Sequence, residues 1–333
     1  MTANLYQKKY FFITGALVVA IFLVSLRVGR YPISLREIAS LLFGGDVADL
    51  TQAVFLRLRL PRTVMALLAG AGLGMAGSVF QLVFKNPLAA PEIVGVSNGA
   101  NLGAALAIVI FGNRAAFLAP SAFLGGMLVL LLVIALARVS RSNSTVTYIL
   151  AGIVMKAISD ACIMVLKFFA DPERELAAME YWAMGSLGGI TAAKLYAMLP
   201  FFLVGFAGLV LLRRQIALLG LDDDESRTLG VEVKFVRVAV LGFAALTVAS
   251  IICQTGLISF IGLIAPHAAR LALKRVNFGW CVLSAMTGAF ILLLSDCLAR
   301  GLSGVEIPIS IPSTFIGVPI LLYFMWKRKM GKV

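Results

Sequence analysis

Ten apolar stretches recur along the chain, each close to the length of about 20 residues that a helix needs to cross a lipid bilayer. They occupy residues 11–28, 63–84, 93–112, 116–137, 144–169, 191–212, 235–255, 258–273, 278–299 and 308–326. Hydrophobic residues make up 61% of the 333 residues, charged residues make up 14%, and the mean hydropathy is +0.99. This composition excludes an ordinary soluble domain. The chain is predicted to be all-α, a polytopic integral membrane protein with about ten transmembrane helices in one domain over 1–333.

The eighth stretch, 258–273, departs most from a simple transmembrane helix. Gly262 and Pro266 interrupt it, and Gly256 stands just before it. Breaks in a membrane helix are tolerated only where protein or water covers the freed backbone groups. We therefore expect a broken or tilted helix at this place.

Small residues recur at every fourth position in the second and third stretches. The positions are Gly70, Gly74 and Ser78 in the second and Gly95, Gly99 and Gly103 in the third. Small residues at this spacing let helix backbones approach closely in lipid, where no hydrophobic force drives helices together. Because an Asn-Pro break at Asn86 joins the two stretches, the pattern predicts a packed membrane hairpin with both helices buried in a bundle.

Basic residues indicate the orientation, because Lys and Arg collect on the cytoplasmic side of bacterial membranes. With an even number of spans and both termini inside, 17 of the 29 basic residues are cytoplasmic, 11 are outside and Lys156 is within a span. The cytoplasmic set is Lys8, Lys9, Lys85, Arg138, Arg141, Arg213, Arg214, Arg227, Lys234, Arg237, Arg270, Lys274, Arg275, Lys327, Arg328, Lys329 and Lys332. Topology and attraction to membrane lipid then account for the net charge of +13, and no separate basic domain suggests nucleic acid.

The sequence lacks the residue patterns that several kinds of chemistry require. The four cysteines, Cys162, Cys253, Cys281 and Cys297, have no metal or redox spacing and are expected to be small packing residues. The only histidine, His267, makes a poor metal relay. A phosphate-binding Gly-x-x-x-x-Gly-Lys-Ser/Thr loop is absent, so any ATP would be hydrolysed on another chain. We expect no catalytic residue, no metal site and no cofactor in this chain, and a protein that is not an enzyme.

A series of motifs resembles the signature of one transport family, the permeases of ATP-binding-cassette (ABC) importers that move iron-siderophore complexes, haem and cobalamin into bacteria. The resemblance covers roughly residues 10 to 327. The motifs are 59–62 (RLPR), 86–89 (NPLA), 95–100 (GVSNGA), 182–187 (WAMGSL), 229–231 (LGV), 256–270 (GLISFIGLIAPHAAR), 295–300 (SDCLAR) and 306–323 (EIPISIPSTFIGVPILLY).

The resemblance implies a function and a set of partners. The partners would be a second permease copy or a paralogue, two cytoplasmic ATPase subunits that hold ATP and Mg²⁺, and an extracytoplasmic substrate-binding protein. The chain would lie in the bacterial cytoplasmic membrane and translocate a metal chelate, with ferric siderophore favoured over haem or cobalamin on family breadth alone. The alternative is a proton-coupled secondary transporter that uses Lys156, Asp160 and Asp296. A membrane scaffold or enzyme is a third possibility, but the sequence shows no combination of nucleophile, base and metal ligands that supports it.

The segment 218–232, LLGLDDDESRTLGVE, lies between the sixth and seventh stretches and carries a run of four acids, Asp222, Asp223, Asp224 and Glu225, on an otherwise basic side. The three aspartates can cap and charge a helix N-terminus. Leu229 and Gly230 can supply an apolar contact and a helix stop. In the family this loop forms short coupling helices that seat in the ATPase subunit, although it usually carries fewer acids. An ordinary solvated loop is the alternative.

Three arginines stand at helix ends that share one compartment. Arg59 and Arg62 open the second stretch and Arg300 closes the ninth. In the family, arginines at these places receive acidic residues of the binding protein, a role that suits guanidinium groups because they pair with carboxylates in a bidentate manner and attract acidic partners. Contacts with lipid headgroups or neighbouring loops are the alternative.

The fifth stretch carries Lys156 and Asp160 near its middle, four residues apart. Each buried charge costs about 2.5 to 3.5 kcal/mol on insertion scales, whereas an i,i+4 ion pair returns only about 0.2 to 0.5 kcal/mol. Water or protein must therefore cover this face. The family resemblance places it beside the translocation pathway, and a charge pair buried between helices is the alternative. Asp296 is expected to form a structural pair with Arg300, one turn away.

The predicted topology can be tested with cysteines introduced at Lys9, Arg141, Asp223 and Lys329. All four should resist an impermeant thiol reagent in intact cells and react after the membrane is permeabilised, because all four are predicted to be cytoplasmic. Labelling of position 223 from outside would contradict both the orientation and the coupling role of 218–232.

Overall fold

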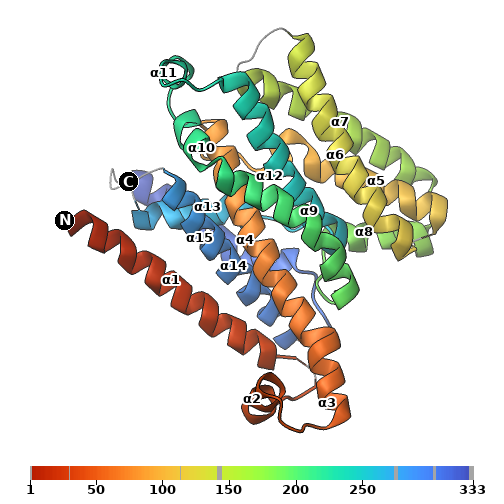
Figure 1. The fold of residues 1–333 in the computed structure, drawn as a ribbon. Coiled ribbons are helices and arrows are strands. Elements are labelled where there is room, and N and C mark those ends of the chain that lie inside the picture. The colour runs from red at the N-terminus through yellow and green to blue at the C-terminus, as the bar shows by residue number, and fades with distance from the viewer. Residues whose placement is uncertain are drawn as a thin grey trace.

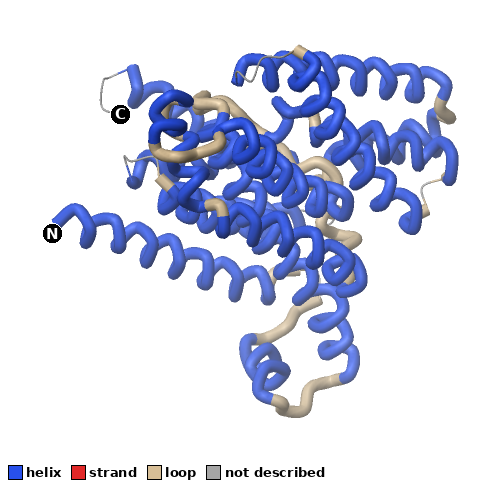
Figure 2. The backbone as a smooth tube through the Cα atoms, turned by 45° about the horizontal axis from the view of Figure 1, so that its top comes forward, coloured by secondary structure: helices blue, strands red, loops and turns tan. Residues whose placement is uncertain are grey.

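The computed structural model describes residues 2–29, 31–112, 114–140, 145–273, 277–302 and 305–329. This part of the chain consists of helices and loops without any strand (Figure 2). Its main helices are α1 (Thr2–Arg27), α4 (Leu60–Val83), α5 (Val96–Phe111), α6 (Ala115–Val139), α7 (Thr145–Phe169), α9 (Ala192–Leu211), α12 (Val233–Thr255), α13 (Ile261–Leu273), α14 (Phe278–Gly301) and α15 (Ser310–Lys329). Each of the ten apolar stretches is therefore helical, which confirms the all-α membrane fold.

The lengths of these helices make the number of full crossings approximate. Seven helices among the described residues are long and apolar enough to span a membrane, and three apolar helices are shorter, namely Val96–Phe111, Ile261–Leu273 and Ser310–Phe324. The eighth stretch is one of the short ones. Its helix α13 runs unbroken through Pro266 but begins only at Ile261, after a non-helical segment in which Phe260 has a φ of +70°. The helix is thus shortened at its start rather than broken at the proline.

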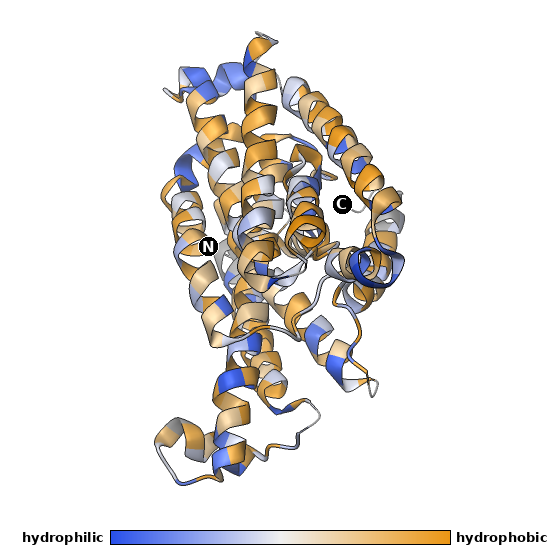
Figure 3. Cartoon of the chain, turned by 90° about the vertical axis from the view of Figure 1, so that its right-hand side faces the viewer, coloured by the Kyte–Doolittle hydropathy of each residue, from blue (hydrophilic) through white to orange (hydrophobic). Residues whose placement is uncertain are grey.

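Shorter elements connect the main helices at the two ends of the bundle (Figure 1). At one end lie α10 (Arg213–Leu219) and α11 (Asp223–Thr228). At the other lie α2 (Leu35–Phe43), α3 (Asp49–Val54), the π-helical turn η1 (Phe55–Arg59), the turn η3 (Pro172–Leu176) and α8 (Ala177–Met184). Hydrophobic residues cover the helices between the ends, and polar segments gather toward the ends (Figure 3).

Helix α4 is the centre of the bundle and packs most extensively on α14, with α13, α12 and α1 as further neighbours. The α4–α14 contact is backbone against backbone. A Cβ atom on Gly70 would collide with the carbonyl oxygen of Gly288, and one on Gly74 would collide with that of Ser284. The small residues that the sequence singled out in α4 therefore serve close packing, as predicted.

The glycines of α5 have the same role against a different partner. A Cβ atom on Gly99 would lie 2.5 Å from the carbonyl oxygen of Gly125 in α6, and one on Gly103 would collide with that of Ser121. The predicted α4–α5 hairpin is wrong, since α5 packs on α6 and α7 and has no extensive contact with α4. Residues 84–95, with the 3₁₀ turn η2 (Pro91–Val94), carry the chain away from α4 before α5 begins.

The two ends of the bundle are defined by contacts as well as by connectivity. Lys85, just after α4, contacts Asp222 beside α11, whereas Arg62, at the start of α4, contacts Asp296 near the end of α14. The described N- and C-terminal ends both lie toward the α11 end (Figure 1). Which end faces the cytoplasm stays a prediction, and Arg141, Lys274, Arg275 and Lys332 of the basic set lie outside the described residues.

All four cysteines are free thiols. Cys253, Cys281 and Cys297 are buried between helices, in agreement with a packing role, but Cys162 is exposed on α7. The expectation that every cysteine is a packing residue is therefore wrong for Cys162, whose side chain is exposed within the described part of the chain.

The close α4–α14 contact predicts different outcomes for two glycine-to-alanine changes. Gly74→Ala should lower the free energy of unfolding by about 1 to 3 kcal/mol, because the new methyl group must push two backbones apart. Gly242→Ala, in α12, is the matched control because nothing lies within 4 Å of its Cβ position. It should be neutral or slightly stabilising, since alanine favours helix. Thermal unfolding of the purified variants in detergent measures both, and equal behaviour would contradict the packing role.

Candidate functional site

A buried carboxylate, Asp296 of α14, organises the end of the bundle opposite α11. Its two oxygens bind two different arginines, with Oδ1 2.7 Å from Arg62 Nη2 and Oδ2 3.0 Å from Arg300 Nη2. Arg62 also lies 2.7 Å from Glu306. The predicted Asp296–Arg300 pair is thus present, and Arg62 and Glu306 enlarge it. Two cations and two anions held together offset the large cost of burying any one of them alone.

Arg59 binds backbone carbonyl groups at the end of α1, and Arg300 shares part of this environment, because it donates to the carbonyl oxygens of Ser25 and Val28 at 2.7 and 2.9 Å. The Arg59 guanidinium is buried and donates to the carbonyl oxygens of Leu26, Arg27 and Val28 at 3.2, 2.7 and 2.7 Å, and also to that of Tyr31. The last carbonyl groups of a helix have no partner within the helix, so Arg59 satisfies the C-terminal end of α1. This contact corresponds to the neighbouring-loop alternative considered for the arginines.

A cavity of about 320 Å³ brings the three predicted docking residues together. Arg59, Arg62, Arg300 and Glu306 line it, and Gly188 closes one side. We call this site the arginine cavity. The side chains of Arg62 and Arg300 are only 11% and 7% exposed, so an acidic group would have to enter the cavity to reach them. Glu306 belongs to a motif that the sequence singled out, but nothing local indicated its pairing with Arg62.

At the opposite end, the acids of the 218–232 segment are tied to two membrane helices. Asp223 accepts two hydrogen bonds from Arg237 Nη2 of α12, at 2.8 and 2.9 Å, and its Oδ1 lies 3.5 Å from Lys85 Nζ. Asp222 lies 3.2 Å from the same Lys85. Asp222 occupies the N-cap position of α11 but makes no capping bond with its side chain, because that side chain binds Lys85 instead.

Arg237 is almost fully buried, and no sequence pattern indicated its pairing with Asp223. Partial burial raises the pKa of Asp223, but the hydrogen bond and charge of Arg237 and the charge of Lys85 outweigh burial and lower the pKa overall. The carboxylate therefore stays ionised at neutral pH. Through Lys85 and Arg237, Asp223 holds α11 against the end of α4 and the start of α12.

Asp224, Glu225 and Leu229 of this segment face outward. Asp224 lies 3.3 Å from Arg227 and its side chain is 94% exposed, and Glu225 is also exposed. Leu229 is 59% exposed. Gly230 has a φ of +81°, and its N–H and that of Val231 donate to the carbonyl groups of Arg227 and Ser226, which ends the helix in a Schellman motif. The side of α11 that does not contact Lys85 and Arg237 is therefore an acidic and partly apolar surface.

The Lys156–Asp160 pair lies on α7, away from both ends. Lys156 Nζ is 2.7 Å from Asp160 Oδ2, and the side chains are 48% and 38% exposed. Asn98 of α5 donates to Asp160 Oδ1 at 2.7 Å, a contact across 62 positions that the sequence did not reveal. The pair is therefore not buried between helices of one chain. Its face of α7 also exposes apolar residues, among them Leu150 and Ile153.

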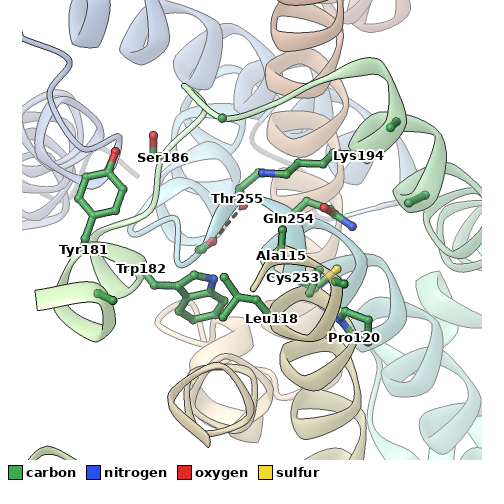
Figure 4. A pocket seen from close by; sticks show the side chains of 17 residues that line it. Ala115, Leu118, Pro120, Tyr181, Trp182, Ser186, Lys194, Cys253, Gln254 and Thr255 are labelled. Carbon is green, nitrogen blue, oxygen red and sulfur yellow. Dashed lines mark hydrogen bonds between the residues drawn. The ribbon is translucent and has the colours of Figure 1, made fainter. Parts of the chain in front are cut away.

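A second, larger cavity has a volume of about 620 Å³ (Figure 4) and reaches Gly189, the residue next to Gly188 of the arginine cavity. Tyr181 and Trp182 of α8, Lys194 of α9, Gln254 of α12 and Leu118 of α6 are among the residues that line it. We call it the aromatic pocket. The sequence motif 182–187 runs along it, but the sequence predicted no binding role for any residue of the pocket.

Comparisons with known proteins agree with this architecture. Residues 17–327 match the FecCD transport family. The chain is 33% identical to the molybdate import system permease protein MolB of Haemophilus influenzae over 99% of both chains, and 35% identical to a probable iron chelatin transport system permease protein of Helicobacter pylori over 83% of both. A solved transporter described as of the metal-chelate ABC type, in an inward-facing conformation, has a TM-score of 0.86 at 32% identity and covers 96% of this chain and 99% of its own.

The contacts of Asp223 with Arg237 and Lys85 predict that α11 becomes more mobile when these contacts are removed. Asp223→Asn should speed amide hydrogen exchange within 223–231 by roughly tenfold or more, because hydrogen bonds to charged groups contribute about 1.5 to 3 kcal/mol. Asp224→Asn is the matched control, since the exposed Asp224 pairs only with Arg227 among the described residues. Exchange measured by mass spectrometry distinguishes the two variants. Equal exchange in the Asp223 variant and the wild type would show that these contacts do not hold α11.

Proposed function

The chain belongs to the FecCD transport family, and from this membership we propose that it is the membrane permease of an ABC importer that carries a ferric siderophore. The family supports the broader statement, a permease for import of metal chelates and related ligands. Ferric siderophore is the proposed cargo because iron chelates recur among the ligands of its relatives.

One observation carries the proposal: two charged assemblies lie at opposite ends of one helical body. The arginine cavity occupies one end, and the acidic surface of α11 occupies the other. An importer of this class needs a receiving surface outside and a coupling surface inside. We assign the arginine cavity to the first and the 218–232 segment to the second, with both termini cytoplasmic.

On the outer side, the arginine cavity would accept acidic side chains from an extracytoplasmic binding protein. Arg62 and Arg300 are held by Asp296, so their guanidinium groups are fixed in position before a partner arrives. An incoming carboxylate could replace Glu306 at Arg62, because Glu306 is the more exposed of the two acids there. Arg59 would contribute positive charge while it holds the end of α1.

On the inner side, α11 and Leu229 would contact an ATPase subunit, and two permease copies would engage two such subunits. ATP and Mg²⁺ would be held on those subunits. Asp222 and Asp223 are committed to Lys85 and Arg237, so they would transmit movement of α11 to α4 and α12. Asp224, Glu225 and Leu229 would make the contact itself, since their side chains point away from the bundle.

The exposed face of α7 would meet the second permease copy, or a paralogue, across the translocation pathway. Lys156 and Asp160 would then line that pathway in a hydrated setting, which their exposure of 48% and 38% favours. Asn98 would keep Asp160 in place beside Lys156.

The alternative of a proton-coupled transporter receives less support. A proton relay through Lys156, Asp160 and Asp296 needs these groups to be linked. Asp296 lies on α14 and is enclosed by Arg62 and Arg300. Lys156 and Asp160 lie on α7, whose extensive contacts are with α5, α6 and η2. Among the described residues, no titratable group is seen to connect the two places.

Uptake into proteoliposomes tests the proposed function. The permease reconstituted with its ATPase and binding protein should accumulate a ferric siderophore only when ATP is enclosed with the ATPase, and a proton uncoupler should have no effect. Uptake without ATP, or its loss on addition of the uncoupler, would contradict the proposal.

Leu229→Lys should reduce ATP-driven uptake several-fold by weakening ATPase association. Leu50→Lys, equally exposed but at the other end, is the matched control and should leave ATPase association unchanged.

A further inference from the structure

The aromatic pocket lies where three apolar helices reach one end of the bundle. Helix α6 begins at Ala115, α9 begins at Ala192 and α12 ends at Thr255, and residues from all three ends line the pocket (Figure 4). Tyr181 and Trp182 of α8 close it from the side. Trp and Tyr prefer the level of the lipid headgroups, where an apolar ring can carry a polar edge. These two rings thus favour a place at headgroup depth for the pocket, which lies at the same end as the arginine cavity.

The polar groups of the pocket favour an anion. Lys194 has no carboxylate within ion-pair distance among the described residues, and no described residue that lines the pocket is acidic. Figure 4 shows the Lys194 side chain extending toward the side of Trp182 and Ser186, so that its ammonium group faces the interior of the pocket. The first turns of α6 and α9 add partial positive charge at the same place.

The apolar part of the pocket favours a ligand with a hydrocarbon chain. Leu118, Ala119 and Ala197 line it, and beyond them the outer faces of α6 and α9 continue with the exposed Leu124 and Phe201. Phe201 packs on Phe123 of α6, with 4.8 Å between the ring centroids, and Leu124 and Phe201 both belong to the apolar length of two spanning helices. A ligand could thus place a charged group near Lys194 and its chains along a continuous apolar surface. A small soluble anion would leave most of a cavity of about 620 Å³ unfilled.

We propose that the aromatic pocket binds an anionic phospholipid from the membrane leaflet at this end of the bundle. The headgroup phosphate lies against Lys194 Nζ, Trp182 and Tyr181 frame the glycerol region, and the acyl chains follow the groove between α6 and α9. This site is distinct from the arginine cavity, although the two cavities adjoin, with Gly188 lining one and Gly189 the other.

Quenching of Trp182 fluorescence by brominated lipids tests the proposal. The purified full chain is delipidated in detergent and titrated with phosphatidylglycerol or phosphatidylcholine carrying the same brominated acyl chains. The difference between wild type and Trp182→Phe isolates the signal of Trp182 from those of Trp280 and Trp326. Phosphatidylglycerol should quench Trp182 at a several-fold lower mole fraction than phosphatidylcholine, because only the former is net anionic.

Variants and a soluble competitor complete the test. Lys194→Met should raise the phosphatidylglycerol fraction needed for half-quenching about fivefold, as one cation near the membrane surface is worth about that factor. Lys194→Arg should stay within about twofold. Arg36→Met, at an exposed position on α2, is the charge-matched control and should have no effect. Unchanged thermal unfolding of Lys194→Met confirms that the variant is folded.

Three results would overturn the proposal. Equal quenching by the two lipids would mean that the pocket does not select an anionic headgroup. An unchanged titration of Lys194→Met would remove Lys194 from the site. Displacement of phosphatidylglycerol by an equal concentration of inorganic phosphate or glycerol 3-phosphate would identify the ligand as a soluble anion rather than a lipid.

Discussion

The backbone contact between α4 and α14 is the constraint on which the rest of the structure depends. In lipid, apolar side chains gain nothing by leaving their surroundings for each other, so close packing must hold the helices together. Gly70 faces Gly288 and Gly74 faces Ser284, and the same antiparallel register brings Arg62 opposite Asp296. The glycine contacts therefore also fix the position of the buried ion network that shapes the arginine cavity.

Charged side chains within the bundle are accommodated in two different ways. Where carboxylates and guanidinium groups are buried, as at Asp296, each charge is shared between partners, so that no ion is left without compensation. Where charges lie in the middle of the apolar length, as at Lys156 and Asp160, the side chains remain partly exposed and are held by one neutral neighbour, Asn98. The first arrangement gives a rigid site, and the second leaves room for water and for another chain.

The sequence predicted the helices, the close approach of α4 and α5 to neighbours, and the two ends at which the charged groups lie. It could not predict the pairing of helices, because small residues at every fourth position show that a backbone comes near without showing which one. The hairpin expectation failed for this reason. Arg237, Glu306 and Asn98 were missed because their partners are distant along the chain. The capping of α1 by Arg59 was likewise invisible, since it involves backbone carbonyl groups rather than a recognisable side-chain pattern.

The interlocked glycines of α4 and α14 also have a mechanical consequence. Two helices whose backbones touch cannot slide past each other without collision, so the pair behaves as one stiff rod. At a rise of 1.5 Å per residue, the 24 residues of α4 give this rod a length of about 36 Å. Lys85 is attached at one end and Arg62 at the other. A small tilt of this helix pair, imposed where α11 contacts the end of α4, would therefore move the arginine cavity at the far end of the pair by several ångströms.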